Sequence, residues 1–189
     1  AEIGTFRKFI DKTLPYIAAS KYNTIQIMAV MNHPYYGSFG YHVANFFSVA
    51  SRFGNPEEFK ELVDTAHKYG MKVIIDLVHS HSVKNELEGL GNFDGRRDLF
   101  FHEGTRGEHP AWDSLCFNYG KNEVLHFLLS NCRFYQEEYH IDGFRFDLMG
   151  IHDIETMNAI RAELNKIDPT IFVYGEGWAA GAPQMPAEE

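Results

Sequence analysis

The sequence has few of the features that direct a protein to a membrane, an oxidising compartment or nucleic acid. It contains only two cysteines, Cys116 and Cys132, so a disulfide framework is not indicated and a cytoplasmic, reducing compartment is expected. No run reaches the roughly 18 apolar residues of a membrane helix, and no signal peptide opens the chain. Basic residues form no cluster, and the formal net charge is −9, which argues against nucleic acid as a partner. We therefore expect a cytoplasmic protein that binds neither membranes nor nucleic acid.

Apolar and aromatic residues, in contrast, are plentiful. They make up 44% and 15% of the 189 residues, which is typical of a globular domain with a real core. The abundant Tyr and Phe residues can stack on sugar rings, although packing in a core is the more frequent use of an aromatic side chain. The chain does not begin with Met, and we interpret both of its ends as cuts. The sequence is thus expected to be an internal fragment of a longer protein.

Short apolar runs alternate with amphipathic helical patterns, which is the signature of βα units and a parallel sheet. The four runs that we expect to be buried strands are residues 22–30, 71–79, 141–148 and 171–177. The helical patterns cover residues 5–19, 56–69, 122–139 and 153–167, and Pro15 weakens the first of them. The fold class predicted from this pattern is α/β.

Two segments depart from the pattern, and both directly follow predicted strands. Residues 31–55 are rich in Tyr, Phe, Gly and His, and residues 80–121 are rich in Gly, Asp, His and Arg. We expect both to be irregular, with the second forming a long inserted loop. Because long connections after strand ends build the active sites of α/β barrels, these segments are the expected walls of a site.

Two carboxylates end neighbouring predicted strands. Arg145 and Asp147 lie two residues apart and therefore point to the same face of one strand. Glu176 ends the next strand between glycines, close to aromatic residues. Retaining glycosidases use one ionised and one protonated carboxyl group in this way, and a guanidinium beside Asp147 would lower its pKa and keep it ionised. The alternative is structural: Arg145 simply neutralises Asp147, and Glu176 bonds to a loop.

A second group of polar residues allows a different chemistry. Asp76 ends the second predicted strand, and His79 and His81 follow two residues apart. A His-x-His pair at a strand end also holds zinc in metal-dependent hydrolases. Because no later strand end in residues 141–178 carries an inward histidine, we predict no metal here.

Aromatic loop residues supply candidate sugar contacts. Tyr36, Tyr41 and His42 lie in the first irregular segment, and Trp112 lies in the second. They could stack on sugar rings or donate hydrogen bonds to them. For some of them packing in the core, or a salt-bridged surface loop around Trp112, explains the residues equally well.

Together these motifs resemble glycoside hydrolase family 13, the α-amylase clan. Residues 76–81, 142–147 and 174–178 are similar to the first three of its four signature regions, in the same order and on successive strands. The resemblance implies a partial (β/α)₈ TIM barrel, roughly strands two to five, that acts on α-glucans without a cofactor. It further implies that Asp147 is the nucleophile and Glu176 the general acid/base. The implied substrate-binding residues are Arg145, His81, Asp76, Tyr41, His42, Tyr36 and Trp178.

The two ends of the chain resemble different members of this family. Residues 1 to about 148 resemble branching enzymes, which transfer a glucan chain from an α-1,4 to an α-1,6 linkage. Residues from about 148 to 189 instead resemble type I pullulanases, which hydrolyse α-1,6 linkages, so a junction near residues 146–150 is expected. The fourth signature region is absent. We therefore expect little or no catalysis from the isolated chain, and a non-catalytic glucan-binding role is a further alternative.

Overall fold

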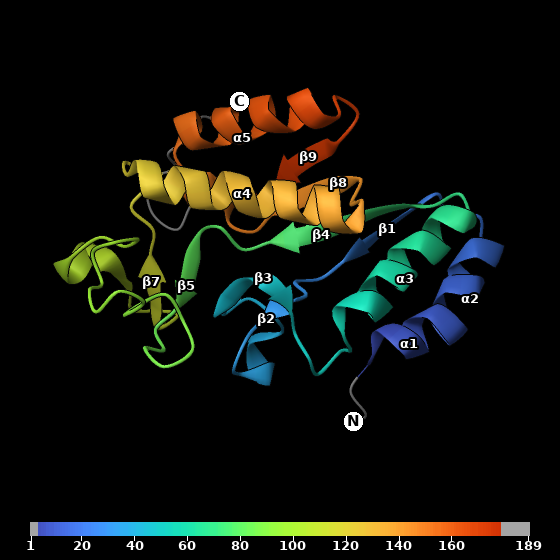
Figure 1. Ribbon diagram of the computed structural model, residues 1–189, viewed down its shortest axis with the longest axis horizontal. Helices are drawn as coiled ribbons and strands as arrows, with labels where there is room; N and C mark the ends of the chain where they lie inside the picture. Colours follow the sequence, from blue (N-terminus) through green and yellow to red (C-terminus); the bar gives the residue numbers. More distant parts are fainter. Residues whose placement is uncertain (1–3, 179–189) are drawn as a thin grey trace.

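A four-stranded parallel sheet forms the centre of the molecule (Figure 1). The computed structural model describes residues 4–178. The strand order is β1-β4-β8-β9. Each of these strands therefore lies beside the one that precedes or follows it among the four in the sequence. The strands are β1 (Thr24–Ile27), β4 (Lys72–Leu77), β8 (Gly143–Phe146) and β9 (Phe172–Gly175). All four lie within the predicted runs, and the predicted α/β class is confirmed.

Helices cover one face of this sheet and connect its strands. They are α3 (Pro56–Lys68), α4 (Asn122–Tyr139) and α5 (Ile154–Ile167). Figure 1 shows α4 and α5 side by side, and α3 contacts α4. Each helix buries its apolar stripe; α4, for example, buries Val124, Leu128 and Cys132 completely. This alternation of parallel strands and helices is typical of the βαβ units of barrel folds.

The N-terminal helical segment is continuous but changes its winding. It consists of α1 (Phe6–Lys8), a π-helical turn η1 (Phe9–Thr13) and α2 (Leu14–Ala19). Pro15 lies in the first turn of α2, where its missing N–H is tolerated. The helix predicted over residues 5–19 is therefore confirmed, and it packs against α3.

The two segments expected to be irregular contain small antiparallel sheets. In the first, β2 (Met31–Asn32) pairs with β3 (Asn45–Val49), and a 3-10 turn η2 (Tyr36–Ser38) lies between them. The second holds β5 (His81–Val83), the turn η3 (Gly104–Gly107), β6 (Glu108–His109) and β7 (Ser114–Cys116). The strand order of this sheet is β5-β7-β6. The prediction of wholly irregular segments is thus wrong, because short strands with mixed polarity carry little periodic signal.

A buried polar pair ties α4 to the sheet and to the first inserted segment. Asn131 and His79 are both 0% exposed. The Nε2 of His79 donates to Oδ1 of Asn131 at 2.8 Å, and Nδ2 of Asn131 donates to the carbonyl of Phe46 at 2.7 Å. These bonds satisfy polar groups that burial would otherwise penalise.

Replacing Asn131 by Ala is expected to lower the free energy of unfolding by about 2 kcal/mol, because it leaves the N–H of His79 and the carbonyl of Phe46 without partners. Urea denaturation followed by circular dichroism measures the change. Ser130→Ala, at an exposed position of the same helix, is the matched control and should change stability by less than about 0.5 kcal/mol. Equal losses in both variants would contradict this account.

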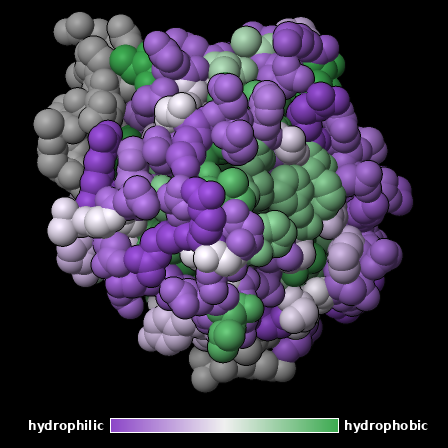
Figure 2. Space-filling model, turned by 60° about the vertical axis from the view of Figure 1, so that its left-hand side comes forward, coloured by the Kyte–Doolittle hydropathy of each residue, from purple (hydrophilic) through white to green (hydrophobic). Residues whose placement is uncertain are grey.

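Among residues 4–178, no helix combines the length and the apolarity needed to cross a bilayer. Figure 2 shows a face covered largely by hydrophilic side chains, with apolar side chains gathered in one area. Cys116 and Cys132 are both free thiols.

Candidate active site

The polar residues singled out in the sequence meet at the carboxyl ends of the parallel strands. Asp76, Arg145 and Tyr174 are in register across β4, β8 and β9. Asp147 follows β8 directly, and Glu176 follows β9. In barrels of this kind the active site is built at this end of the sheet. The structure therefore brings the two predicted catalytic carboxylates together.

A single guanidinium group connects three carboxylates. The Nη1 of Arg145 lies 2.8 Å from Oδ2 of Asp76 and 3.1 Å from Oδ1 of Asp147. Its Nη2 lies 3.2 Å from Oε1 of Glu176. The arginine side chain is 16% exposed, so these contacts lie in a poorly solvated region where charge interactions are strong. The planar fork of arginine suits this multiple recognition.

Asp147 differs from the sequence expectation in its ionisation. Burial raises its pKa from the ordinary value to about 6, Arg145 opposes this effect, and the nearby charges of Glu176 and Asp76 add to it. The predicted lowering of the pKa by Arg145 is therefore wrong in its net direction. The physical reason is that one cation is shared among three carboxylates, so it does not outweigh burial and repulsion together.

Asp76 lies beneath the site and anchors it. It is 1% exposed, and its Oδ2 accepts a hydrogen bond from Tyr41 Oη at 2.7 Å in addition to that from Arg145. Burial, followed by the bond to Asp76, raises the pKa of Tyr41 far above its ordinary range. Gly40, with φ of +95°, lies so close to the segment that follows β1 that a Cβ atom would be 2.2 Å from the carbonyl oxygen of Ala29. This approach places Tyr41 over Asp76.

His81 supports the same loop from the other side. Its Nε2 donates to the carbonyl of Tyr41 at 2.8 Å, and its Nδ1 accepts from Ser80 Oγ at 3.0 Å. Burial lowers the pKa of His81 to about 4, so the ring is neutral near pH 7. The ring of His42 meets it edge-on, with centroids 5.9 Å apart. His81 therefore positions Tyr41 and His42.

The geometry gives no support to a zinc site. His79 bonds to Asn131 in the core, whereas His81 bonds to the backbone of Tyr41. Within residues 4–178, no group of three or more His, Cys, Asp or Glu side chains is arranged to hold a metal ion. The two histidines thus serve packing and positioning.

A cavity of about 340 Å³ opens above the carboxylates. Its lining residues are Ser38, Tyr41, His42, His81, Trp112, Asp147, Leu148, Glu176 and Trp178. Trp112 is held by stacking on His109, with ring centroids 3.7 Å apart. Six of the nine predicted site residues line this cavity: Tyr41, His42, His81, Asp147, Glu176 and Trp178. Arg145 contacts both Asp76 and Asp147 from beneath, and Tyr36 lines a different cavity.

Leu148 is a lining residue that the sequence did not reveal. Its φ of +48° places it in the left-handed region, which is costly for a residue with a Cβ atom. In this conformation its backbone N–H donates to Oε2 of Glu176 at 3.2 Å. Both oxygens of Glu176 therefore face donors. No pattern in the sequence signals a backbone conformation of this kind.

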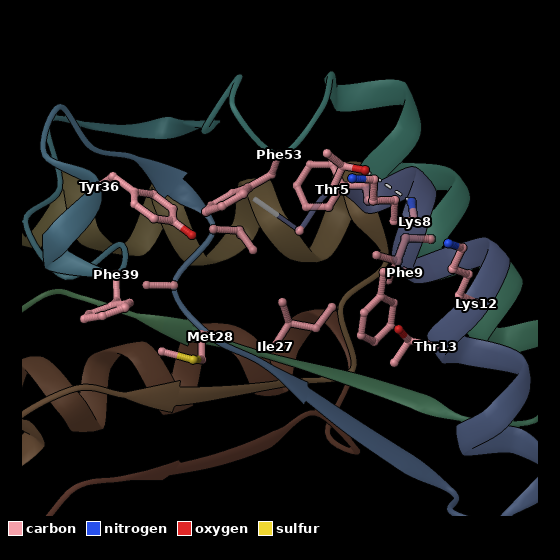
Figure 3. Close-up of a pocket in the computed structure, with 15 residues that line it drawn as sticks. Thr5, Lys8, Phe9, Lys12, Thr13, Ile27, Met28, Tyr36, Phe39 and Phe53 are labelled. Carbon is pink, nitrogen blue, oxygen red and sulfur yellow. Dashed lines mark hydrogen bonds between the residues drawn. The ribbon is translucent and has the colours of Figure 1, made fainter. Parts of the chain in front are cut away.

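Tyr36 contributes to a different cavity, of about 360 Å³, shown in Figure 3. Phe9, Ile27, Phe39 and Phe53 also line it. Arg52 lies over the Tyr36 ring at 5.5 Å from its centroid. The lining contains no carboxyl group, so this cavity has no counterpart of the pair formed by Asp147 and Glu176. The structure thus separates Tyr36 from the other predicted sugar contacts.

Comparison with protein families and curated proteins agrees with this arrangement. The family model described as alpha amylase, catalytic domain, matches residues 1–114. A 1,4-alpha-glucan-branching enzyme of Yarrowia lipolytica is 57% identical over 145 residues, which are 77% of this chain and 21% of that enzyme. The chain therefore spans about a fifth of the length of the curated relatives it matches.

Solved structures share the fold. An alpha-amylase from Anoxybacillus is 26% identical, with a TM-score of 0.83 over 93% of this chain and 40% of that one. A pullulanase from an Anoxybacillus species, complexed with maltotriose, is 23% identical, with a TM-score of 0.83 over 98% of this chain and 30% of that one. The second likeness concerns the fold alone. These neighbours confirm the predicted relation to α-amylase barrels.

Proposed function

Because this chain belongs to the alpha-amylase catalytic-domain family, we propose that it carries the catalytic carboxylates of a retaining α-glucan branching enzyme. Such an enzyme cuts an α-1,4 linkage and passes the glucan chain to a 6-hydroxyl group. The observation that supports this most is the pair Asp147 and Glu176 on one guanidinium at the carboxyl end of the sheet. The identity of 57% to a branching enzyme over 77% of the chain favours transfer over other reactions of the family.

The first step of the proposed reaction forms a covalent intermediate. A carboxylate oxygen of Asp147 attacks the anomeric carbon of the glucan, and the bond from that carbon to the glycosidic oxygen breaks. Glu176 gives its proton to the departing oxygen, which leaves as a hydroxyl group. Arg145 faces both carboxylates and stabilises the negative charge, which Asp147 carries before the attack and Glu176 carries after it has given up its proton. No cofactor takes part.

The second step transfers the chain. Glu176, now ionised, takes the proton of an acceptor 6-hydroxyl, whose oxygen attacks the anomeric carbon. The ester bond to Asp147 breaks and returns the carboxylate. Tyr41, His42 and Trp178, which line the cavity, are proposed to contact the sugar at the cleavage point, and His81 and Asp76 to hold Tyr41 there. Tyr36 is proposed only as a more distant contact.

Debranching is the second candidate. It is favoured by the short connection of 28 residues between Asp147 and Glu176, which contains the turn η4 (Met149–Ile151), α5 and β9. In this reaction water replaces the 6-hydroxyl acceptor and the linkage that is cut is α-1,6. A junction of two family sequences near residues 146–150 remains part of this proposal. Glucan binding without turnover is the third candidate.

Product analysis distinguishes these candidates. The 189-residue chain, and a chain lengthened by four further βα units, would each be incubated with amylose and with a branched glucan. New α-1,6 branch points without a rise in reducing ends support the branching proposal. Released linear chains with new reducing ends would favour debranching, and retention on a glucan column with neither product would favour binding alone.

The rate of glucan transfer is expected to rise with pH through about 6. Below the pKa of Asp147, which is about 6, the carboxyl group is protonated and is a poor nucleophile; above it, the attacking oxygen is available. His81 stays neutral in this range because its pKa is about 4. Measuring kcat/KM from pH 4.5 to 8 shows whether the rate rises through pH 6. A rate that falls between pH 5 and 7 would contradict the assignment.

The cytoplasmic location is likewise a proposal. It is supported by the two free thiols, which are typical of a reducing compartment. The proposed partner is an α-glucan such as glycogen or starch.

A further inference from the structure

The carboxylate site rests on a polar layer that crosses the inside of the sheet. Barrel interiors are normally filled by layers of bulky apolar side chains. Here Asp76, Arg145 and Tyr174 are in register on three neighbouring strands. Gln26 of β1 completes the layer, because its Nε2 donates to Oδ1 of Asp76 at 2.7 Å. The carbonyl oxygen of the same amide group, Oε1, accepts a hydrogen bond from the Tyr174 hydroxyl.

This contact joins the two outer strands of the sheet. Gln26 lies on β1 and Tyr174 on β9, which are the first and last strands in the order β1-β4-β8-β9. Their side chains meet on the concave inner face although they lie 148 positions apart in the sequence. The sheet is therefore already curved as in a barrel, and the contact spans it from edge to edge.

The chemistry of the partners fixes the orientation of the Gln26 amide. The carboxylate of Asp76 also contacts Arg145 and accepts from Tyr41, so it presents only acceptors to Gln26. The NH₂ group of Gln26 must therefore face Asp76, and its carbonyl oxygen must face Tyr174. The tyrosine hydroxyl, as a donor, holds the amide in this orientation.

Asp76 in turn fixes Arg145. Within residues 4–178, Gln26 is the donor to Oδ1, whereas Tyr41 and Arg145 share Oδ2. Without the bond to Oδ1, only the contacts of Oδ2 with Tyr41 and Arg145 orient the carboxylate, so the position of the guanidinium is less tightly fixed. The position of Arg145 between Asp147 and Glu176 depends on that contact.

We propose that Gln26 and Tyr174 are positioning residues that act through Asp76 and Arg145 on the carboxylate pair. The role in catalysis rests on the proposed function, whereas the positioning itself does not depend on any substrate. Neither residue contacts the cavity above the carboxylates. The hydroxyl of Tyr174 donates to Gln26, and we expect it to act chiefly through that bond, so the effects of the two substitutions on Asp147 should not be additive.

The test follows the titration of Asp147 in the 189-residue chain by ¹³C NMR of labelled aspartate carboxyl groups. The variants are Gln26→Leu, Tyr174→Phe and the double variant, with Tyr16→Phe at a 75% exposed site as the matched control. Thermal unfolding of each variant verifies that it is folded. Because Arg145 opposes the upward shift of the Asp147 pKa, loosening its position should raise the titration midpoint.

We expect Gln26→Leu to raise the midpoint by about half a unit or more, Tyr174→Phe to raise it in the same direction, and the double variant to match Gln26→Leu. Tyr16→Phe should leave it unchanged. An unchanged or lowered midpoint in folded Gln26→Leu, or effects of the two changes that simply add, would overturn the proposal. If Gln26→Leu does not fold, the hydroxyl deletion in Tyr174→Phe decides alone. The titration uses no glucan, so a failure of the branching assay leaves this result independent.

Discussion

Replacing Asp147 by Asn is expected to lower the rate of glucan transfer by about 10⁴-fold or more. The amide keeps the size of the side chain but has no ionised oxygen to attack the anomeric carbon. The rate is measured on amylose in the chain lengthened by four further βα units, since a closed barrel of this class has eight strands. Asp64→Asn, in a surface pair with Lys68, is the matched control and should keep the full rate.

The same variant is expected to be more stable than the parent at pH 7. The pKa of Asp147 in the folded protein, about 6, lies above the ordinary value of 3.8. A raised acid pKa means that the unfolded state loses its proton first, so folding stability falls as the pH rises from about 4 to 6. Removing this charge should therefore raise the free energy of unfolding by about 2 kcal/mol at pH 7 and change it little at pH 4. A variant that is inactive because it is unfolded would instead lose stability at both pH values.

Replacing Arg145 by Met is expected to lower the free energy of unfolding by about 3 kcal/mol at pH 7. The change leaves Asp76, Asp147 and Glu176 close together without the cation that each of them contacts. Uncompensated charge in a poorly solvated site is costly. Urea denaturation at pH 7 and at pH 5 measures the effect.

The loss of unfolding free energy in Arg145→Met should be smaller at pH 5, because Asp147 is then mostly protonated and the repulsion between the carboxylates is weaker. Arg145→Lys is the matched control: it keeps the charge but replaces the planar fork with a single ammonium group. We expect its stability to lie between those of the parent and Arg145→Met. A methionine variant as stable as the parent at pH 7 would show that the guanidinium does not hold the carboxylates together.

The fold could be predicted from the sequence where the pattern is strong. The four strands are short apolar runs between turn residues, and the helices repeat apolar residues at helical spacing, so both signals are local. The meeting of Asp147 and Glu176 followed from the parallel order alone, because all carboxyl ends of a parallel sheet lie at one edge.

Other features depend on residues far apart in the chain. The pKa of Asp147 reflects its burial and the sharing of Arg145 with Asp76 and Glu176, and none of these follows from spacing on one strand. The bond between Gln26 and Tyr174 requires the curvature of the whole sheet. The sequence offered one sign that Gln26 has a polar partner: it is a polar residue within an otherwise apolar part of the predicted strand. The short strands β5 and β7 pair with each other although many residues separate them in the chain, so their sequences alone resembled loops.

Covalent trapping tests the assignment of the nucleophile most directly. A fluorinated glucosyl fluoride, which slows the breakdown of a glycosyl–enzyme ester, would be incubated with the lengthened chain, and the digested protein analysed by mass spectrometry. We predict a glucosyl adduct on the peptide that contains Asp147, and no adduct in Asp147→Asn. An adduct on Glu176 or Asp76, or none from a preparation that turns over amylose, would contradict the account.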